Sequence, residues 1–170
     1  GELLALRWQD VDLHAGAVQV TQAVEWVRGK PIMAEPKTTS SRRAIPLTAL
    51  AIEALKRHRA RQAEERLAAG PLWQDSGRAF TDVFGEVVDR HGLAKRAFPR
   101  LTAKAGVKRV RFHDLRHTAA TFMLAEGLPV KTVQRVLGHA TATMTLDRYG
   151  HVLPNSVRAA ASVMDSLLSR

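Results

Sequence analysis

Hydrophobic residues recur at helical spacing through the last third of the chain. Apolar side chains separated by three or four residues form one face of a helix. The pattern therefore predicts four helices in this region, at roughly 113–126, 130–138, 142–148 and 156–168. Gly138 closes the second of them, because glycine is a common helix terminator.

The apolar period changes between Asp10 and Leu47, where four β-branched residues lie close together: Val18, Val20, Val24 and Val27. Such residues favour strands, and glycine or clusters of small polar residues favour turns. The predicted segments are, in order, a strand carrying these valines, a turn at 28–30, a strand at 31–35, a turn at 38–41 and a strand at 42–47. They form one small antiparallel sheet, with Lys37 at the turn between its second and third strands.

Three further helices are predicted outside these two regions. Residues 2–8 read as the last turns of a helix, Thr48 caps a long helix that reaches about Ala69, and a helix at about 92–105 ends before Gly106. A short strand at 79–81 and a turn near Gly85 lie between them. With neither repeats nor a low-complexity linker, the chain is predicted to be a single α+β domain, mainly α-helical, with a small three-stranded antiparallel sheet.

Composition adds a bias toward polyanionic partners. The 170 residues are 45% hydrophobic and 25% charged, which is typical of a globular domain, and no apolar run is long enough to span a membrane. There are no cysteines, so disulfides and thiolate metal sites are excluded. The net charge of +10, from 26 Lys and Arg against 16 Asp and Glu, points to a polyanionic partner such as DNA, although a basic solvated surface would account for the charge equally well.

The stretch from Phe112 to His151 also holds four of the seven histidines and the only tyrosine, Tyr149. Cleavage of a phosphodiester needs a nucleophile, positive charge for the transition state and an acid for the leaving oxygen. Tyr149 offers the nucleophile, and Arg116 offers a planar fork for two phosphate oxygens. His139 can donate to the same phosphate, while His113, three residues before Arg116, can accept a proton. Lys37 is a candidate acid, and with this much fixed positive charge we expect no metal and no other cofactor.

At these residues the chain resembles the tyrosine recombinases, the phage-integrase family. Two segments carry the resemblance most clearly, HDLRHTAATFMLAEG and LGHATATMTLDRYGHV, and two others carry it more weakly, GELLALRWQDVDL and PKTTSSRRAIPL. They span nearly the whole chain in the family's order, and the 33 positions between Arg116 and Tyr149 are typical of it. The resemblance implies a tyrosine-recombinase catalytic domain, mostly helical with a small sheet.

The resemblance also assigns a role to each candidate. Tyr149 attacks the scissile phosphate to give a 3′-phosphotyrosyl bond and a free 5′ hydroxyl, and no ATP is needed because the protein–DNA bond conserves the energy for rejoining. Arg116 and His139 stabilise the phosphate. His113 assists proton transfer, and Lys37 is the general acid.

Other residues are expected to support the site or to contact DNA. Glu2 matches an acidic residue that supports the family's active site, and His117 and His151 are interpreted as supporting residues. Candidate contacts to the phosphates of double-stranded DNA are Arg42, Arg43, Lys108, Arg109 and Arg111. The remaining histidines, which belong to no motif and are interpreted as surface residues, are His14, His58 and His91.

One departure concerns the beginning of the chain. The family uses two catalytic arginines, and the first would fall three residues ahead of Glu2, before Gly1. We therefore expect residues 1–170 to be a catalytic domain truncated at its N-terminal end, without the core-binding domain and with impaired cleavage. The family also implies self-association on DNA, as a tetramer. The helix at 156–168 either docks into a neighbouring protomer or packs on its own domain. A cytoplasmic protein of bacterial or phage origin is expected.

Three other functions remain open on the sequence alone. A DNA-binding module without chemistry would share the basic charge. A type IB topoisomerase would share the tyrosine chemistry. A zinc-dependent hydrolase would use the His113 and His117 pair, whose spacing resembles that of a zinc-protease helix, although Asp114 replaces the usual glutamate and the positive charge of Arg116 would oppose the metal.

Overall fold

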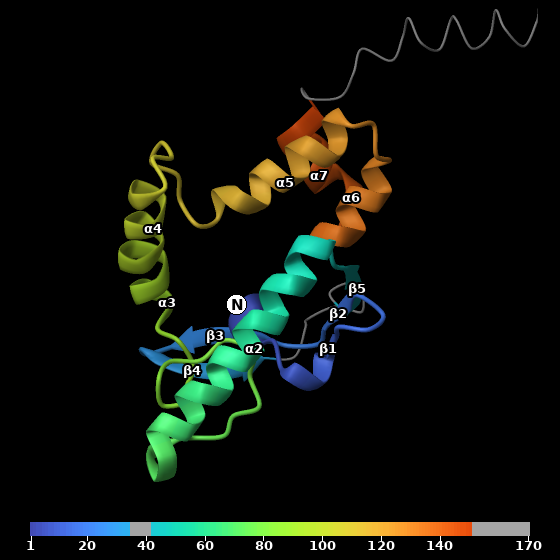
Figure 1. Cartoon of the computed structure of the whole chain (residues 1–170). Helices are drawn as coiled ribbons and strands as arrows, with labels where there is room; N and C mark the ends of the chain where they lie inside the picture. The colour runs from blue at the N-terminus through green and yellow to red at the C-terminus, as the bar shows by residue number, and fades with distance from the viewer. Residues whose placement is uncertain (35–41, 151–170) are drawn as a thin grey trace, which may run out of the picture. The chain divides into compact units, whose positions relative to one another are not determined.

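The computed structural model describes residues 1–34 and 42–150 of the chain. It divides into a first unit, Gly1–Phe112, and a second unit that begins at His113. Each unit has its own cluster of buried apolar residues. The two units are described separately below (Figure 1).

The first unit contains all of the described strands and the longest described helix. Its helices include short 3-10 segments (η1 and η3) and one π-helical turn (η4). The elements in order are α1 (Glu2–Ala5), η1 (Trp8–Asp10), β1 (Val11–Asp12), β2 (Ala17–Val20), β3 (Ala23–Val27), β4 (Lys30–Ala34), β5 (Arg43–Pro46), α2 (Ala49–Ala69), η3 (Gly70–Leu72), α3 (Arg90–Gly92), η4 (Leu93–Ala97) and α4 (Phe98–Lys104).

The strands form two antiparallel sheets rather than the one predicted. β3 pairs with β4 in a hairpin, whose two-residue loop, Arg28 and Gly29, has positive φ at both positions. This is the type I′ geometry that closes a tight hairpin. β5 does not continue from β4 but pairs with β2, in a register that sets Val18 opposite Ile45, and β1 completes that sheet. The predicted strand order was wrong because the pairing of β5 with β2 is non-local.

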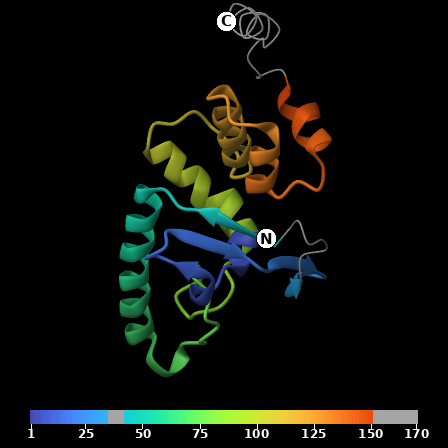
Figure 2. The same ribbon diagram turned by 90° about the vertical axis from the view of Figure 1, so that its right-hand side faces the viewer.

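The long helix α2 begins where the sequence predicted. The hydroxyl of Thr48 accepts a hydrogen bond from Ala51 N at 3.2 Å, which caps the first turn. Figure 2 shows α2 running along one side of the strands. Gln62 is its buried residue, so a polar side chain anchors this helix.

The segment after α2 is held by isolated bridges instead of the short strand predicted at 79–81. Arg78 bridges to Arg7, and Thr81 bridges to Val87. The turn predicted near Gly85 is confirmed, with φ of +86° and a hydrogen bond from Gly85 N to Asp82 O at 3.1 Å. The predicted helix at 92–105 is present as α3, η4 and α4, which run from Arg90 to Lys104.

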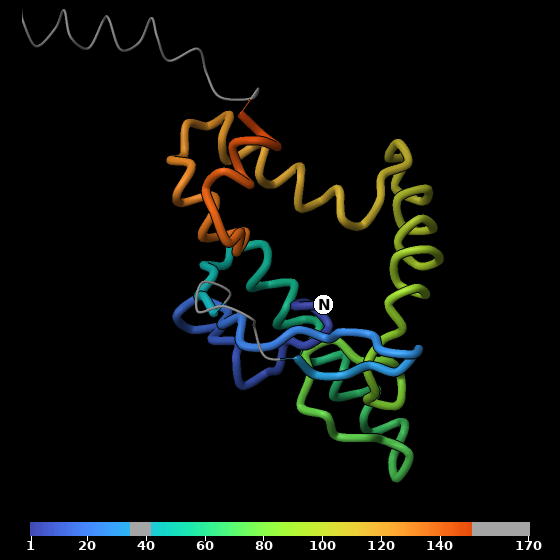
Figure 3. Tube along the Cα trace, turned by 180° about the vertical axis from the view of Figure 1, so that it is seen from behind, coloured from blue at the N-terminus to red at the C-terminus, as the bar shows by residue number. Residues whose placement is uncertain are grey.

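The second unit packs three helices together, and Figure 3 shows them in orange and red. These helices are α5 (Asp114–Ala125), α6 (Val130–Leu137) and α7 (Ala142–Tyr149). Their bounds agree with the sequence prediction to within one residue at most ends. The predicted helix at 156–168 lies outside the described residues.

Candidate active site

Tyr149 lies at the end of α7, and its ring is part of the core of the second unit. It is 4% exposed and packs in a cluster with Leu124, Val133 and Leu137. Its hydroxyl lies 2.5 Å from Nδ1 of His117 on α5. The phenol is therefore placed by apolar packing at its ring and by one imidazole at its oxygen.

The two histidines of α5 lie next to each other. His113 is the N-cap residue of α5 and His117 is one turn later, so their rings meet edge to face with centroids 5.0 Å apart. Partial desolvation lowers the pKa of His113 below its usual value of 6.5, and the positive groups of His117, Arg116 and Arg148 lower it further, while Asp114 opposes them. The His113 ring therefore favours the neutral form, which can accept a proton.

His139 follows the C-terminus of α6 in a turn that several groups fix. Gly138 takes the left-handed conformation (φ +71°) that ends the helix, as glycine does most readily. The Gln134 side-chain amide donates to His139 O at 3.1 Å, and His139 N donates to Gln134 O at 3.1 Å. The hydroxyl of Thr145, which is fully buried, lies 2.9 Å from His139 Nδ1. This contact orients the imidazole.

Arg116 is tied to the same turn. One guanidinium N–H donates to Leu137 O at the last residue of α6, where helix carbonyls lack partners within the helix. Arg116 and His139 are thus both attached to the end of α6. A cavity of about 350 Å³ opens beside His139, and its other lining residues are Met144, Asp147 and Arg148.

Glu2 and Arg43 pair within the first unit. Two guanidinium nitrogens of Arg43 each donate to a carboxylate oxygen of Glu2, both at 2.8 Å. Arg43 is 8% exposed. We expected Arg43 to contact DNA phosphates; the structure buries it against a carboxylate instead, because alternate residues of β5 face opposite sides.

The other expected residues have mixed outcomes. Lys37 and His151 lie outside the described residues.

His58 is not a simple surface residue, since its Nε2 lies 2.6 Å from Ala79 O and its ring stacks on Phe80. The remaining candidate DNA contacts are exposed: Arg42, Lys108, Arg109 and Arg111.

Sequence reasoning missed three residues of this site, Gln134, Thr145 and Arg148, and gave His117 only a supporting role. Thr145 and Gln134 carried no signal, because the spacing of polar residues in a helix does not show which of them contact a neighbouring turn. Arg148 is adjacent to Tyr149, and that proximity could have singled it out.

Within residues 1–34 and 42–150, no group of three His, Cys, Asp or Glu side chains is placed to hold a metal ion. His117, one of the two histidines that suggested a zinc-hydrolase helix, lies against the Tyr149 hydroxyl, and His113 packs on the His117 ring.

Residues 1–156 match the model of the phage integrase family, and the chain belongs to that family. A curated relative, a XerC-like tyrosine recombinase of Caldanaerobacter subterraneus subsp. tengcongensis, is 35% identical over an alignment that covers 98% of this chain and 46% of the relative. The chain thus spans about half the length of such relatives.

Solved structures give the same assignment. The integrase of transposon Tn1549, in complex with transposon right-end DNA, matches with a TM-score of 0.76 and 25% identity, over 98% of this chain and 54% of the other. The XerH recombinase in a post-cleavage complex with a palindromic difH substrate matches with a TM-score of 0.63 and 25% identity, over 96% and 41% of the respective chains. The fold is that of a tyrosine-recombinase catalytic domain, as predicted.

Among the helices of the described ranges, none combines the length and apolar character that crossing a membrane requires.

Proposed function

We propose that this chain is the catalytic part of a site-specific DNA recombinase, which cleaves and rejoins double-stranded DNA through Tyr149. The phenolic oxygen bonds to the scissile phosphorus, and the bond from phosphorus to the 5′ oxygen breaks. The products are a 3′-phosphotyrosyl link and a 5′ hydroxyl. Attack of a 5′ hydroxyl on that link reverses the step and joins the strands, so no energy-supplying cofactor is required.

The observation that carries this proposal is the contact between Tyr149 and His117. A phenol with a pKa near ~10 is a weak nucleophile unless a base removes its proton. His117 Nδ1 lies 2.5 Å from the hydroxyl and is within reach of that proton. We therefore assign His117 the first proton transfer, which the sequence alone had led us to give to His113.

The remaining roles follow from the groups near the end of α6. Arg116 and His139 bind non-bridging oxygens of the phosphate, where fixed donors stabilise the charge of the transition state. Arg148 and His139 line the cavity of about 350 Å³, and Arg148 adds positive charge there. His113, in its neutral form, relays protons. Lys37 remains our proposed acid for the 5′ oxygen.

The proposed partners are double-stranded DNA and further copies of the same protein. Exposed Arg42, Lys108, Arg109 and Arg111 supply sequence-independent contacts to the DNA backbone. Exchange between two duplexes requires two cleavages on each, which a tetramer of such subunits provides. We place this activity in the cytoplasm of a bacterium, where chromosomal and mobile DNA meet.

A nicked suicide duplex tests the proposal, because loss of the short strand after cleavage traps the covalent intermediate. Residues 1–170 should be compared with a version extended upstream to include the first catalytic arginine that the family uses. We expect a denaturation-resistant protein–DNA adduct, weak or absent without the extension. Tyr149→Phe should abolish it and leave non-covalent duplex affinity within about twofold, because one hydroxyl contributes little to a phosphate-dominated interface. DNA binding without any adduct in either version would instead indicate a non-catalytic DNA-binding module.

A further inference from the structure

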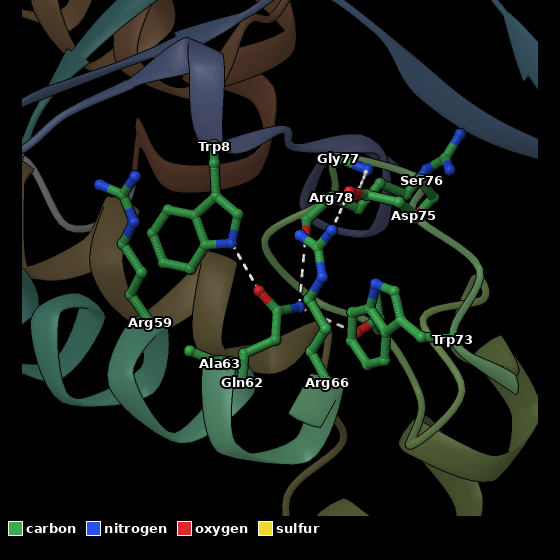
Figure 4. A pocket seen from close by; sticks show the side chains of 11 residues that line it. Trp8, Arg59, Gln62, Ala63, Arg66, Trp73, Asp75, Ser76, Gly77 and Arg78 are labelled. Carbon is green, nitrogen blue, oxygen red and sulfur yellow. Dashed lines mark hydrogen bonds and ion pairs between the residues drawn. The ribbon is translucent and has the colours of Figure 1, made fainter. Parts of the chain in front are cut away.

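A cavity of about 200 Å³ lies in the first unit, between α2 and the segment after η3 (Figure 4). Arg59, Gln62 and Arg66 project into its wall from one face of α2, since they follow each other at intervals of three and four residues. Trp8 and Trp73 also line the cavity. These residues are distinct from those of the proposed active site.

The cavity wall is preformed by hydrogen bonds to Gln62. Its Oε1 accepts from Trp8 Nε1 at 2.5 Å, and its Nε2 donates to Arg78 O at 3.2 Å and to Thr81 Oγ1 at 2.8 Å. The Arg59 guanidinium lies 5.3 Å from the centre of the Trp8 ring, a cation–π distance. Figure 4 shows Arg59 beside Trp8 at one end of the pocket. A ligand would therefore meet groups that are already in place.

Hydrogen-bond donors outnumber acceptors in this wall. Three arginines, Arg59, Arg66 and Arg78, line the cavity, and its lining contains one carboxylate, that of Asp75. That carboxylate is already engaged by Arg66 at 3.0 Å, and Gln62 Oε1 is engaged by Trp8. The cavity wall can therefore donate further hydrogen bonds to a ligand, but it has few free acceptors.

Two buried donors strengthen this imbalance. Trp73 Nε1 and Arg78 Nε are shielded from solvent, and no acceptor among the described residues meets either atom. Buried polar atoms normally have partners, and a missing acceptor indicates a ligand or water that supplies one. Both residues line the cavity.

We propose that this cavity binds a phosphate group. A phosphate carries several acceptor oxygens and negative charge, which matches a wall of guanidinium and indole donors. A metal cation would be repelled by the three arginines, and an apolar ligand would leave them desolvated and unpaired. The phosphate belongs either to the backbone of duplex DNA, at a point outside the cleavage site, or to a free phosphorylated small molecule.

The tryptophans provide the test. The chain has three, so a proton–nitrogen NMR spectrum shows three indole signals, and Trp26, in β3, is an internal reference outside the cavity. Inorganic phosphate, titrated at constant ionic strength, should shift the Trp8 and Trp73 signals saturably and leave that of Trp26 in place. Absence of a saturable shift with both inorganic phosphate and a short duplex would overturn the proposal.

Variants with opposite expected effects sharpen this test. Arg59→Gln should weaken phosphate binding about tenfold, the usual scale for one charge-assisted contact. Asp75→Asn should tighten it, because Arg66 then loses its competing carboxylate. Arg100→Gln, at an exposed position on α4, is the matched control and should change binding less than twofold. Equal weakening by Arg59→Gln and Arg100→Gln would show non-specific ion binding and contradict a built site.

Comparison of the two titrations identifies the source of the phosphate. If a short duplex shifts the same two signals and Arg59→Gln weakens that response about tenfold, the ligand is DNA backbone. If inorganic phosphate alone does so, the ligand is a small phosphorylated molecule. Either result supports the cavity as a phosphate site. Tyr149→Phe should leave these titrations unchanged, so this proposal and that of strand cleavage fail separately.

Discussion

Gln62 in the first unit and Tyr149 in the second are both buried polar side chains, exposed by 7% and 4% respectively. Gln62 is hydrogen-bonded at its oxygen and its nitrogen, to an indole, to backbone carbonyls and to a hydroxyl. None of these partners changes its charge near neutral pH. The Tyr149 hydroxyl meets one imidazole, that of His117, and both members of that pair can exchange a proton.

The difference separates a structural network from a reactive one. A buried network of neutral, fully paired groups fixes one arrangement of the chain. A buried pair of titratable groups also fixes an arrangement, but it keeps a path for proton transfer. We therefore expect changes at Gln62 to act on stability and changes at His117 to act on chemistry.

The largest effect is expected from His117→Phe, which keeps a ring of similar size and removes the Nδ1 atom. Loss of a general base typically slows a reaction by about 10²–10⁴-fold. The rate of adduct formation on the suicide duplex should fall by this order, in the version of the protein that forms the adduct. The free energy of unfolding should fall by only about 1–2 kcal/mol, the cost of leaving one buried hydroxyl unpaired.

His14→Gln serves as the control for that substitution, since His14 is exposed and in the first unit. Its adduct rate should match that of the unsubstituted protein. An unchanged rate in His117→Phe would remove His117 from the mechanism and return the proton-transfer role to His113.

Gln62→Leu should have the reverse profile. It leaves Trp8 Nε1 without its acceptor and Thr81 without its donor. Stranded buried polar groups cost about 1–3 kcal/mol each, so urea denaturation should show a loss of about 2–4 kcal/mol. The rate of adduct formation per folded molecule should stay unchanged. A tenfold slower rate in a fully folded sample of this variant would contradict the distinction between a structural network and a reactive one.

Thr145→Val should produce an intermediate effect on chemistry. Valine has the same shape but lacks the hydroxyl that lies 2.9 Å from His139 Nδ1. We expect about a tenfold slower adduct formation, the scale of one hydrogen bond of about 1.4 kcal/mol. Nitrogen NMR of the imidazole should show a changed balance of His139 tautomers.

Thr145→Ser is the matched comparison, because it keeps the hydroxyl and removes the methyl group. It should restore the tautomer and most of the rate, at a modest cost in stability from the small void. If serine and valine slowed the reaction equally, Thr145 would act through packing and not through His139.

The smallest effect concerns pH. Partial desolvation, followed by nearby positive charge, lowers the pKa of His113. Its neutral form therefore persists below pH 6.5 and is lost only as the pH falls through the lowered pKa. An NMR titration should place the His113 midpoint below that of a free histidine. Arg148→Gln should move it upward, because one positive neighbour is removed; a downward shift would contradict that electrostatic account.

Local signals in the sequence predicted much of the fold. Thr48, Gly106 and Gly138 mark helix ends because capping and left-handed geometry depend on the residues at those positions. The turn at Arg28 and Gly29 was predicted for the same reason. The pairing of β5 with β2 was not predictable in this way, because register between distant strands depends on packing across the whole unit.

Prediction of the site from the sequence meets the same limit. Tyr149, Arg116, His113 and His139 stand in recognisable motifs, so they could be nominated from sequence. The partner of the Tyr149 hydroxyl could not, because His117 and Tyr149 are 32 residues apart and meet only when α5 and α7 pack together. Arg42 and Arg43 are equally basic neighbours, and only the structure shows that one is exposed while the other is buried against Glu2.

The central claim is that Tyr149 forms the covalent bond to DNA, and the chemical nature of the adduct tests it most directly. The trapped protein–DNA complex should be digested with protease and nuclease, and the modified residue identified by mass spectrometry. Because the chain contains one tyrosine, the account predicts a nucleotide attached to the peptide that carries Tyr149 and to no other. A nucleotide attached to a serine, threonine or histidine would contradict it.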